Sequence, residues 1–177
     1  MYYLRLQFKA PLQSWGIKED WYKTRRTASM STKTALTGLI GRAMGVWSEE
    51  TERLEGISDS IQDIRPVSDT SDVRRLTDDQ TLYVGDYVDL GLASGLPAAG
   101  GGIKRTNAGA TLSQQYTKDY LEDTVIEIDL GGSKDFLERV KDALIHPVYP
   151  PYIGRYCCAP AECIIKDGII REESEER

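Results

Sequence analysis

The sequence predicts an α+β protein with an antiparallel, ferredoxin-like sheet whose helices lie on one face. Three observations lead to this class. Segments of alternating apolar residues, typical of half-buried strands, occur near the start, in the middle and near the end of the chain. Segments with apolar residues at helical spacing lie between them. With 177 residues the chain is long enough for one hydrophobic core and short for two, which predicts a single domain over residues 1–177.

The first predicted strand covers residues 2–8, where apolar and polar side chains alternate. Leu4, Leu6 and Phe8 share one face, which we expect to point into the core. A proline and a glycine between residues 10 and 16 are expected to end this strand, because proline lacks a backbone donor.

A helix is predicted over residues 32–45, after a polar, basic loop. Ser31 or Thr32 can cap its start. Gly38 and Gly41 lower its intrinsic helix propensity, and we interpret them as points where the helix lies close against the sheet. Its apolar stripe consists of Ala35, Leu36, Leu39, Ile40, Ala43 and Met44.

The middle of the chain contains a short acidic helix around residues 49–55 and a strand near 61–67. The stretch 81–115 is different in kind, because it is rich in glycine, lacks periodicity and is too long for an ordinary connection. We expect it to form an arm inserted into the domain.

The C-terminal part begins with a strand at 124–130 and a helix at 135–144 that Ser133 can cap. Prolines between residues 147 and 151 then favour extended, irregular chain. Residues 162–172 are interpreted as a hairpin, since Asp-Gly suits a tight type I′ turn. The last six residues are expected to form a frayed tail.

Charge is unevenly distributed along a chain whose formal net charge is −6. Residues 12–45 carry six basic side chains against two acidic ones, a local net of +4. Residues 46–79 carry four basic against ten acidic side chains, a net of −6. Such segregation permits one face toward phosphates and another that repels them.

The expected compartment is the cytoplasm. No window approaches 18 consecutive apolar residues, so no membrane span is predicted, and the first residues lack the pattern of a signal peptide. Cys157, Cys158 and Cys163 form no evenly spaced framework, which fits small core or near-surface thiols in a reducing environment.

Four segments together resemble the CasD family of CRISPR-associated proteins. In chain order they are LRLQFKAPLQSWG at 4–16, RRTASMSTKTALTGLIGRAMG at 25–45, QYTKDYLED at 115–123 and PVYPPYIGRYCCAP at 147–160. Their order and spacing match over roughly the whole chain. One departure from the family pattern is Tyr156, which stands where the family has a second arginine.

The resemblance implies an RNA-binding fold related to the RNA recognition motif, with a protruding β-hairpin thumb that would be the 81–115 stretch. It implies a subunit of the type I-E Cascade complex that binds the 5′ handle of the CRISPR RNA (crRNA) guide. Such a subunit contacts the backbone subunit CasC and the large subunit CasA, and it does not cut RNA.

Three groups of residues are candidates for RNA contacts. Cations and hydroxyls at a helix N-terminus suit phosphate oxygens, tyrosines interleaved with arginine suit unstacked bases, and a basic pair in the arm suits the strand's backbone. On composition alone, a solvated basic loop and tyrosines that cover a sheet edge remain open alternatives. Gln13 and Trp15 are further candidates for the same face, and a place in the core is an equal alternative for Trp15. The candidates are Arg25, Arg26, Thr27, Lys33 and Thr34; Tyr152, Gly154 and Arg155, next to Tyr149 and Tyr156; and Lys104 and Arg105.

Other functions have weaker support in the sequence. No phosphate-binding glycine loop or zinc spacing is present, so neither a cofactor nor a metal is predicted. His146 is the only histidine, and a helix-end or packing role is expected for it. The alternative is a metal-independent endoribonuclease that processes CRISPR precursor RNA, like a type I-C relative, with His146 beside a Tyr or Lys. A domain that binds only proteins through the acidic segment is a third possibility.

Overall fold

The computed structural model describes residues 1–17, 24–69, 73–82 and 114–173. The chain divides into two compact units. The first comprises Met1–Ile17, Arg26–Leu76 and Tyr120–Arg177, and the second comprises Lys18–Arg25 and Thr77–Asp119. Apart from its ends, the arm predicted at 81–115, with Lys104 and Arg105, lies outside the described residues, as does the end of the tail.

The first unit is built on an antiparallel sheet. Strand β1 (Tyr2–Gln13) pairs with β5 (Gln114–Gly132) on one side and with β6 (Ile165–Glu172) on the other. Strand β3 (Asp63–Pro66) pairs with β5 through residues such as Ile64 opposite Leu130. Leu4, Leu6 and Phe8 of β1 are fully buried, as the alternation predicted.

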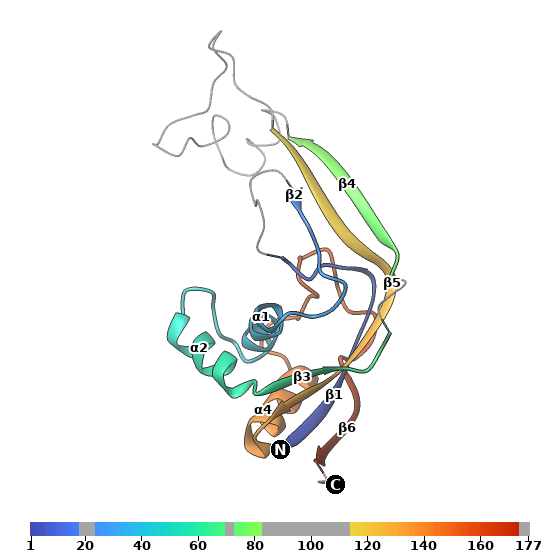
Figure 1. Ribbon diagram of the computed structural model, residues 1–177. Coiled ribbons are helices and arrows are strands. Elements are labelled where there is room, and N and C mark those ends of the chain that lie inside the picture. Colours follow the sequence, from blue (N-terminus) through green and yellow to red (C-terminus); the bar gives the residue numbers. More distant parts are fainter. Residues whose placement is uncertain (18–23, 70–72, 83–113, 174–177) are drawn as a thin grey trace. The chain divides into compact units, whose positions relative to one another are not determined.

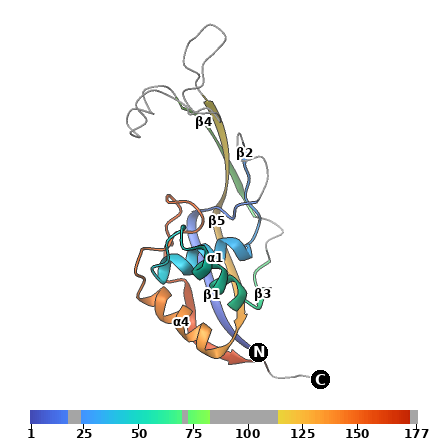
Figure 2. The same ribbon diagram turned by 90° about the vertical axis from the view of Figure 1, so that its left-hand side faces the viewer.

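Helices α1 (Lys33–Ala43), α2 (Thr51–Ser60) and α4 (Lys134–Ile145) lie on the same side of this sheet (Figures 1 and 2). The Thr32 hydroxyl accepts a hydrogen bond from the Ala35 amide at 3.3 Å, and Ser133 caps α4 in the same way. Both predicted caps are therefore confirmed. Within the described residues, no helix is both long and apolar enough to cross a membrane.

In the second unit, β2 (Thr24–Arg25) pairs in parallel with the start of β5, and β4 (Arg75–Leu82), which was not predicted, also pairs with β5. The α+β class with an antiparallel sheet is thus observed, while the thumb hairpin stays a prediction.

Strand β1 does not end where the sequence analysis placed its end. The register with β5 continues unbroken across Pro11, from Ala10 opposite Thr124 to Leu12 opposite Glu122. Strand β6 pairs only with the first residues of β1. Pro11 therefore lies where β1 has one strand neighbour, and such an edge tolerates a missing backbone donor.

The predicted C-terminal hairpin is wrong. Residues 165–172 form one strand, and its register against β1 shifts between Leu4 and Leu6. Gly168 adopts a positive φ of 68° within this shift. The Asp-Gly pair therefore forms a bulge in a continuous strand, because long-range pairing with β1 outweighs the local turn preference.

Candidate nucleic-acid interface

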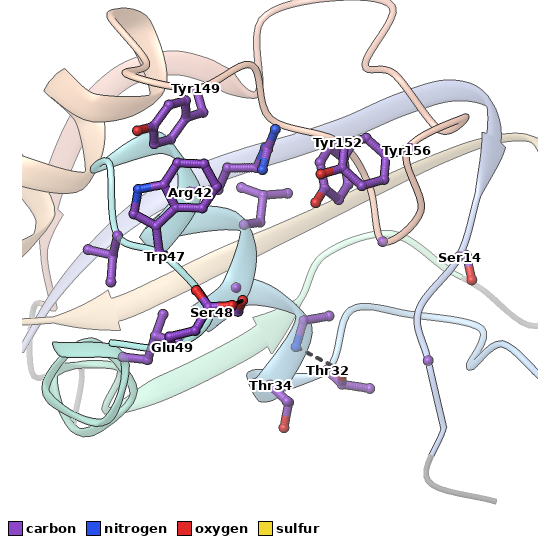
Figure 3. Close-up of a pocket in the computed structure, with 17 residues that line it drawn as sticks. Ser14, Thr32, Thr34, Arg42, Trp47, Ser48, Glu49, Tyr149, Tyr152 and Tyr156 are labelled. Atoms are coloured by element: carbon purple, nitrogen blue, oxygen red, sulfur yellow. Dashed lines mark hydrogen bonds between the residues drawn. The ribbon is translucent and has the colours of Figure 1, made fainter. Parts of the chain in front are cut away.

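A groove of about 540 Å³ lies beside α1, in the first unit. Four parts of the chain line it: the segment just after β1, the exposed side of α1 with the turn that follows, Leu54 of α2, and the proline-rich loop after α4 (Figure 3). Segments far apart in the sequence thus meet here, and they include parts of the basic region 12–45 and of the tyrosine-rich loop.

Arg42, on the last turn of α1, occupies the centre of a tyrosine cluster (Figure 3). Its guanidinium carbon lies 4.6 Å from the ring centroid of Tyr152, 5.3 Å from that of Tyr156 and 5.6 Å from that of Tyr149. Its Nε donates a hydrogen bond to the Pro150 carbonyl at 3.0 Å. These contacts hold the guanidinium in place by cation–π attraction, and among the described residues neither terminal nitrogen has a hydrogen-bond acceptor.

The partners of Arg42 distinguish it from five arginines of this acidic chain that pair with a carboxylate. Within the described residues, no carboxylate oxygen lies within ion-pair distance of Arg42. A positive charge without an acidic partner, fixed on aromatic rings, is suited to an anion from outside the chain. Arginines that do pair with a carboxylate are Arg5, Arg53, Arg65, Arg74 and Arg171.

Exposed aromatic rings border the same groove. Trp47 is 54% exposed, and its ring centroid lies 4.9 Å from that of Tyr149. Tyr156 is 78% exposed and lies 4.4 Å from Tyr152. Burial and the hydrogen bond with Tyr156 raise the pKa of Tyr152 above its ordinary value. Open ring faces beside a cation are the arrangement with which proteins stack single-stranded bases.

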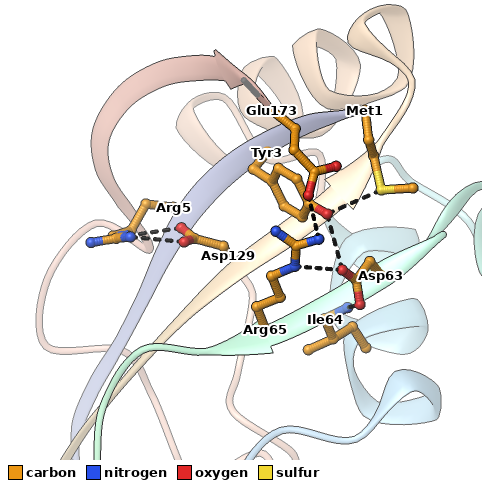
Figure 4. A network of polar contacts seen from close by, with 8 residues as sticks. All are labelled: Met1, Tyr3, Arg5, Asp63, Ile64, Arg65, Asp129 and Glu173. Atoms are coloured by element: carbon orange, nitrogen blue, oxygen red, sulfur yellow. Dashed lines mark hydrogen bonds and ion pairs between the residues drawn. The ribbon is translucent and has the colours of Figure 1, made fainter. Parts of the chain in front are cut away.

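The opposite face of the sheet has a different chemistry. Arg5 on β1 forms two hydrogen bonds, of 2.8 and 2.7 Å, with Asp129 on β5 (Figure 4). Arg65 bonds both Asp63 and Glu173 at 2.7 Å. RNA recognition motifs present aromatic residues on their open sheet face. Because carboxylates neutralise these two arginines, we place the candidate interface on the helix side.

The groove unites part of the predicted set. Thr34, Tyr152 and Gly154 line it together with Tyr149 and Tyr156. Lys33 is exposed as the first residue of α1, between the groove-lining Thr32 and Thr34. The start of α1 and the tyrosine loop therefore lie around one groove.

Other predicted residues lie elsewhere. Arg26 is exposed in the first unit but does not line the groove, and Arg25 lies in β2 of the second unit. The guanidinium carbon of Arg155 lies 4.5 Å from the ring centroid of the buried Tyr120. Tyr120 belongs to the third family segment, so Arg155 joins two of the signature segments.

Thr27 has a structural role. It is 1% exposed, accepts a hydrogen bond from the Trp15 amide at 2.7 Å and donates to the Ala28 carbonyl at 3.0 Å. Trp15 and Gln13 are also fully buried, and the indole Nε1 donates to the Gln13 side chain at 3.2 Å. The APLQSWG signature and Thr27 thus secure the core beneath the groove.

We expect Thr27→Val to lower stability without weakening RNA binding. The change leaves the buried Trp15 amide without its acceptor, which costs about 1–3 kcal/mol. Denaturant unfolding of the isolated chain measures this loss. Thr34→Val is the matched control, since its hydroxyl is exposed beside the groove, and it should leave the unfolding free energy unchanged. An equal loss of stability in both variants would contradict the structural role of Thr27.

His146 and the cysteines have no arrangement that points to chemistry. His146 is exposed at the C-cap of α4, where its amide donates to the Asp142 carbonyl at 2.8 Å. This confirms the predicted helix-end position. Cys158 is buried and Cys157 and Cys163 are exposed, and burial raises the pKa of the Cys158 thiol to about 11.

Comparison with known proteins agrees with the resemblance in the sequence. The family model described as CRISPR-associated protein (Cas_Cas5) matches residues 3–176. The Cascade subunit CasD of Escherichia coli strain K12 is 26% identical over 159 residues, which cover 88% of this chain and 66% of CasD. This chain therefore spans slightly less than two thirds of that relative.

Solved structures share the fold. A chain of a CRISPR RNA-guided surveillance complex superimposes with a TM-score of 0.65 at 23% identity, covering 92% of this chain and 61% of the other. A crystal structure of a Cas protein superimposes with a TM-score of 0.51 at 21% identity, covering 97% of this chain and 67% of the other. Since the family model spans nearly every residue, the chain belongs to the CRISPR-associated Cas_Cas5 protein family.

Proposed function

We propose that this chain is a crRNA-binding subunit of a Cascade-type surveillance complex, which holds the 5′ handle of the guide in the groove beside α1. The observation that carries the proposal is Arg42, a cation held on three tyrosine rings with no carboxylate partner in the described residues. In a chain of net charge −6, such a group is a specific site for phosphate rather than part of a general basic surface.

Aromatic and hydroxyl groups complete a site for a single strand. The exposed rings of Trp47 and Tyr156 accept unstacked bases, each worth about 1–3 kcal/mol. Thr32 and Thr34 place hydroxyls at the positive end of the α1 dipole, which favours a phosphate. An ordered double helix would not expose its base faces to these rings.

The partners in this proposal are the backbone subunit CasC and the large subunit CasA of a complex in the cytoplasm. The relative CasD is itself a Cascade subunit. Helix α2 and its N-cap carry Glu50, Glu52, Glu55 and Asp59, none of which lines the groove, whereas the preceding Glu49 does line it. This acidic surface repels RNA and is a suitable contact for a partner protein.

Purification of the assembled complex tests the proposal. We expect that co-expression with the partner subunits and a CRISPR array yields a complex whose guide has a nuclease-protected 5′ handle. The handle should be released as salt is raised, because phosphate contacts weaken with ionic strength. A stable complex with the handle fully open to nuclease would contradict the proposal.

In the same proposal the subunit does not cut RNA. Incubation of the purified chain with repeat RNA in EDTA should leave the RNA intact. Cleavage that disappears in the His146→Ala variant would instead establish the metal-independent endoribonuclease.

A further inference from the structure

Gly38 is a glycine in the interior of α1 that packing does not explain. A side chain there would meet no atom within 4 Å, and the position is exposed. A glycine in a helix interior costs about 1 kcal/mol relative to alanine. The prediction that α1 lies close against the sheet at Gly38 is wrong, because the space around this position is open.

Gly41, one turn away, shows what a packing glycine looks like. A Cβ at Gly41 would lie 2.6 Å from a methyl group of Leu54, so this glycine lets α2 approach α1. Gly56 on α2 is open like Gly38 but does not line the groove. Open space alone therefore identifies no site, and the position of Gly38 within the groove is what matters.

Gly38 lies between two groups that suit phosphates. Thr34, Gly38 and Arg42 are spaced by four residues, lie on one side of α1 and all line the groove. The eight residue steps from Thr34 to Arg42 span about 12 Å along the helix. Gly38 lies between the Thr34 hydroxyl and the Arg42 guanidinium, which has no carboxylate partner in the described residues. At this position no side chain covers the backbone of α1.

A second glycine of the groove lining also has open space where a side chain would be. Gly16, which follows β1, also lines the groove, and a Cβ there would again meet nothing within 4 Å. The third glycine of the lining, Gly154, is explained by its packing against Ser14. Two glycines without a packing reason thus lie in one groove, where they allow a ligand to approach the protein backbone closely.

We propose that the ribose–phosphate backbone of a single RNA strand lies directly against α1 at Gly38, with phosphates toward Thr34 and Arg42. This rests on the proposed function, and it specifies which part of the RNA contacts the helix. Glycine is required because any side chain would occupy the path of the strand. Folding does not require it, so ligand binding and stability respond differently to a substitution here.

The test is a size series at Gly38 in the assembled complex, with Gly38→Ala and Gly38→Leu. We expect the thermal midpoint of each isolated variant to equal or exceed that of the wild type, because alanine and leucine are better helix formers. The dissociation constant for the handle should rise with side-chain size, by about tenfold or more for leucine. Gly56→Leu, the same change at an open helix position that does not line the groove, should leave RNA binding unchanged.

Hydroxyl-radical cleavage of the bound guide gives a second readout, because it attacks exposed riboses. Gly38→Leu should make the riboses of one or two handle nucleotides accessible to cleavage. Gly16→Leu should do the same for neighbouring nucleotides. Gly38→Leu could bind the handle like the wild type while Arg42→Ala weakens binding. The groove would then be the RNA site, but the proposed contact between the RNA backbone and α1 at Gly38 would be wrong. If neither variant changes binding, the groove itself is wrongly assigned. Equal losses in Gly38→Leu and Gly56→Leu would also overturn the inference.

Discussion

Arg42→Ala weakens binding of the guide's 5′ handle in the assembled complex by about ten- to a hundredfold. The expected loss corresponds to one hydrogen-bonded contact between charged groups, about 1.5–3 kcal/mol, and each 1.4 kcal/mol changes the dissociation constant tenfold. Arg42→Lys keeps the charge but loses the planar donors and the stacking on tyrosine, so its effect should be intermediate. Equilibrium binding at several salt concentrations measures both variants.

Arg53→Ala is the matched control for this prediction. Arg53 is exposed on α2 and pairs with Glu50 at 2.6 Å, so its removal changes the net charge equally but removes no groove contact. The slope of log K against log salt should flatten by about 0.7 for Arg42→Ala, the value for one phosphate contact on a single strand. Similar losses in Arg42→Ala and Arg53→Ala would mean that only overall charge matters, and the site at Arg42 would be wrong.

Local patterns predicted those elements in which local and long-range preferences agree. Helices α1 and α4 have both an apolar stripe and a capping hydroxyl, and both were predicted nearly to their ends. The Asp-Gly pair in β6 led to a wrong hairpin prediction, because it favours a turn locally. Pairing with β1 instead keeps residues 165–172 in one strand. Strand β4 lies in a polar segment without alternation, so only its pairing with β5 reveals it.

The candidate site was predicted where its residues are close in sequence and missed where they come together only in the fold. The tyrosine loop and Thr34 were identified, but Arg42 and Trp47 were not. Arg42 meets Pro150 only through the fold, since 108 residues separate them. One signal was present: no acidic residue stands three or four positions from Arg42, whereas Arg53 has Glu50 and Glu49 at those distances. An arginine on a helix without such a partner is a candidate for an external anion.

Gly154 and Gly38 both line the groove, yet we expect opposite behaviour from them. Gly154 is one of the residues that the sequence predicts to contact RNA. The structure gives it a packing reason, because its φ is 89° and a Cβ would lie 1.7 Å from the Ser14 carbonyl oxygen. The neighbouring Ile153 carbonyl accepts a hydrogen bond from the Ser14 amide at 3.1 Å, so the loop cannot move away without losing that contact.

Gly154→Ala therefore destabilises the isolated chain, without RNA, by about 3 kcal/mol or more. The positive φ alone costs about 1–3 kcal/mol for a residue with a side chain, and the clash with Ser14 adds to it. For a chain of this size the thermal midpoint should fall by roughly 6–12 °C or more. Gly168→Ala is the control, since Gly168 has a similar φ of 68° but its nearest neighbour would be 3.6 Å from the Cβ. We expect Gly168→Ala to lose less stability, because it has the backbone strain without the clash. The difference between the two variants then measures the cost of the clash with Ser14. If Gly154→Ala melted like the wild type but failed to bind the handle, Gly154 would be a ligand contact after all.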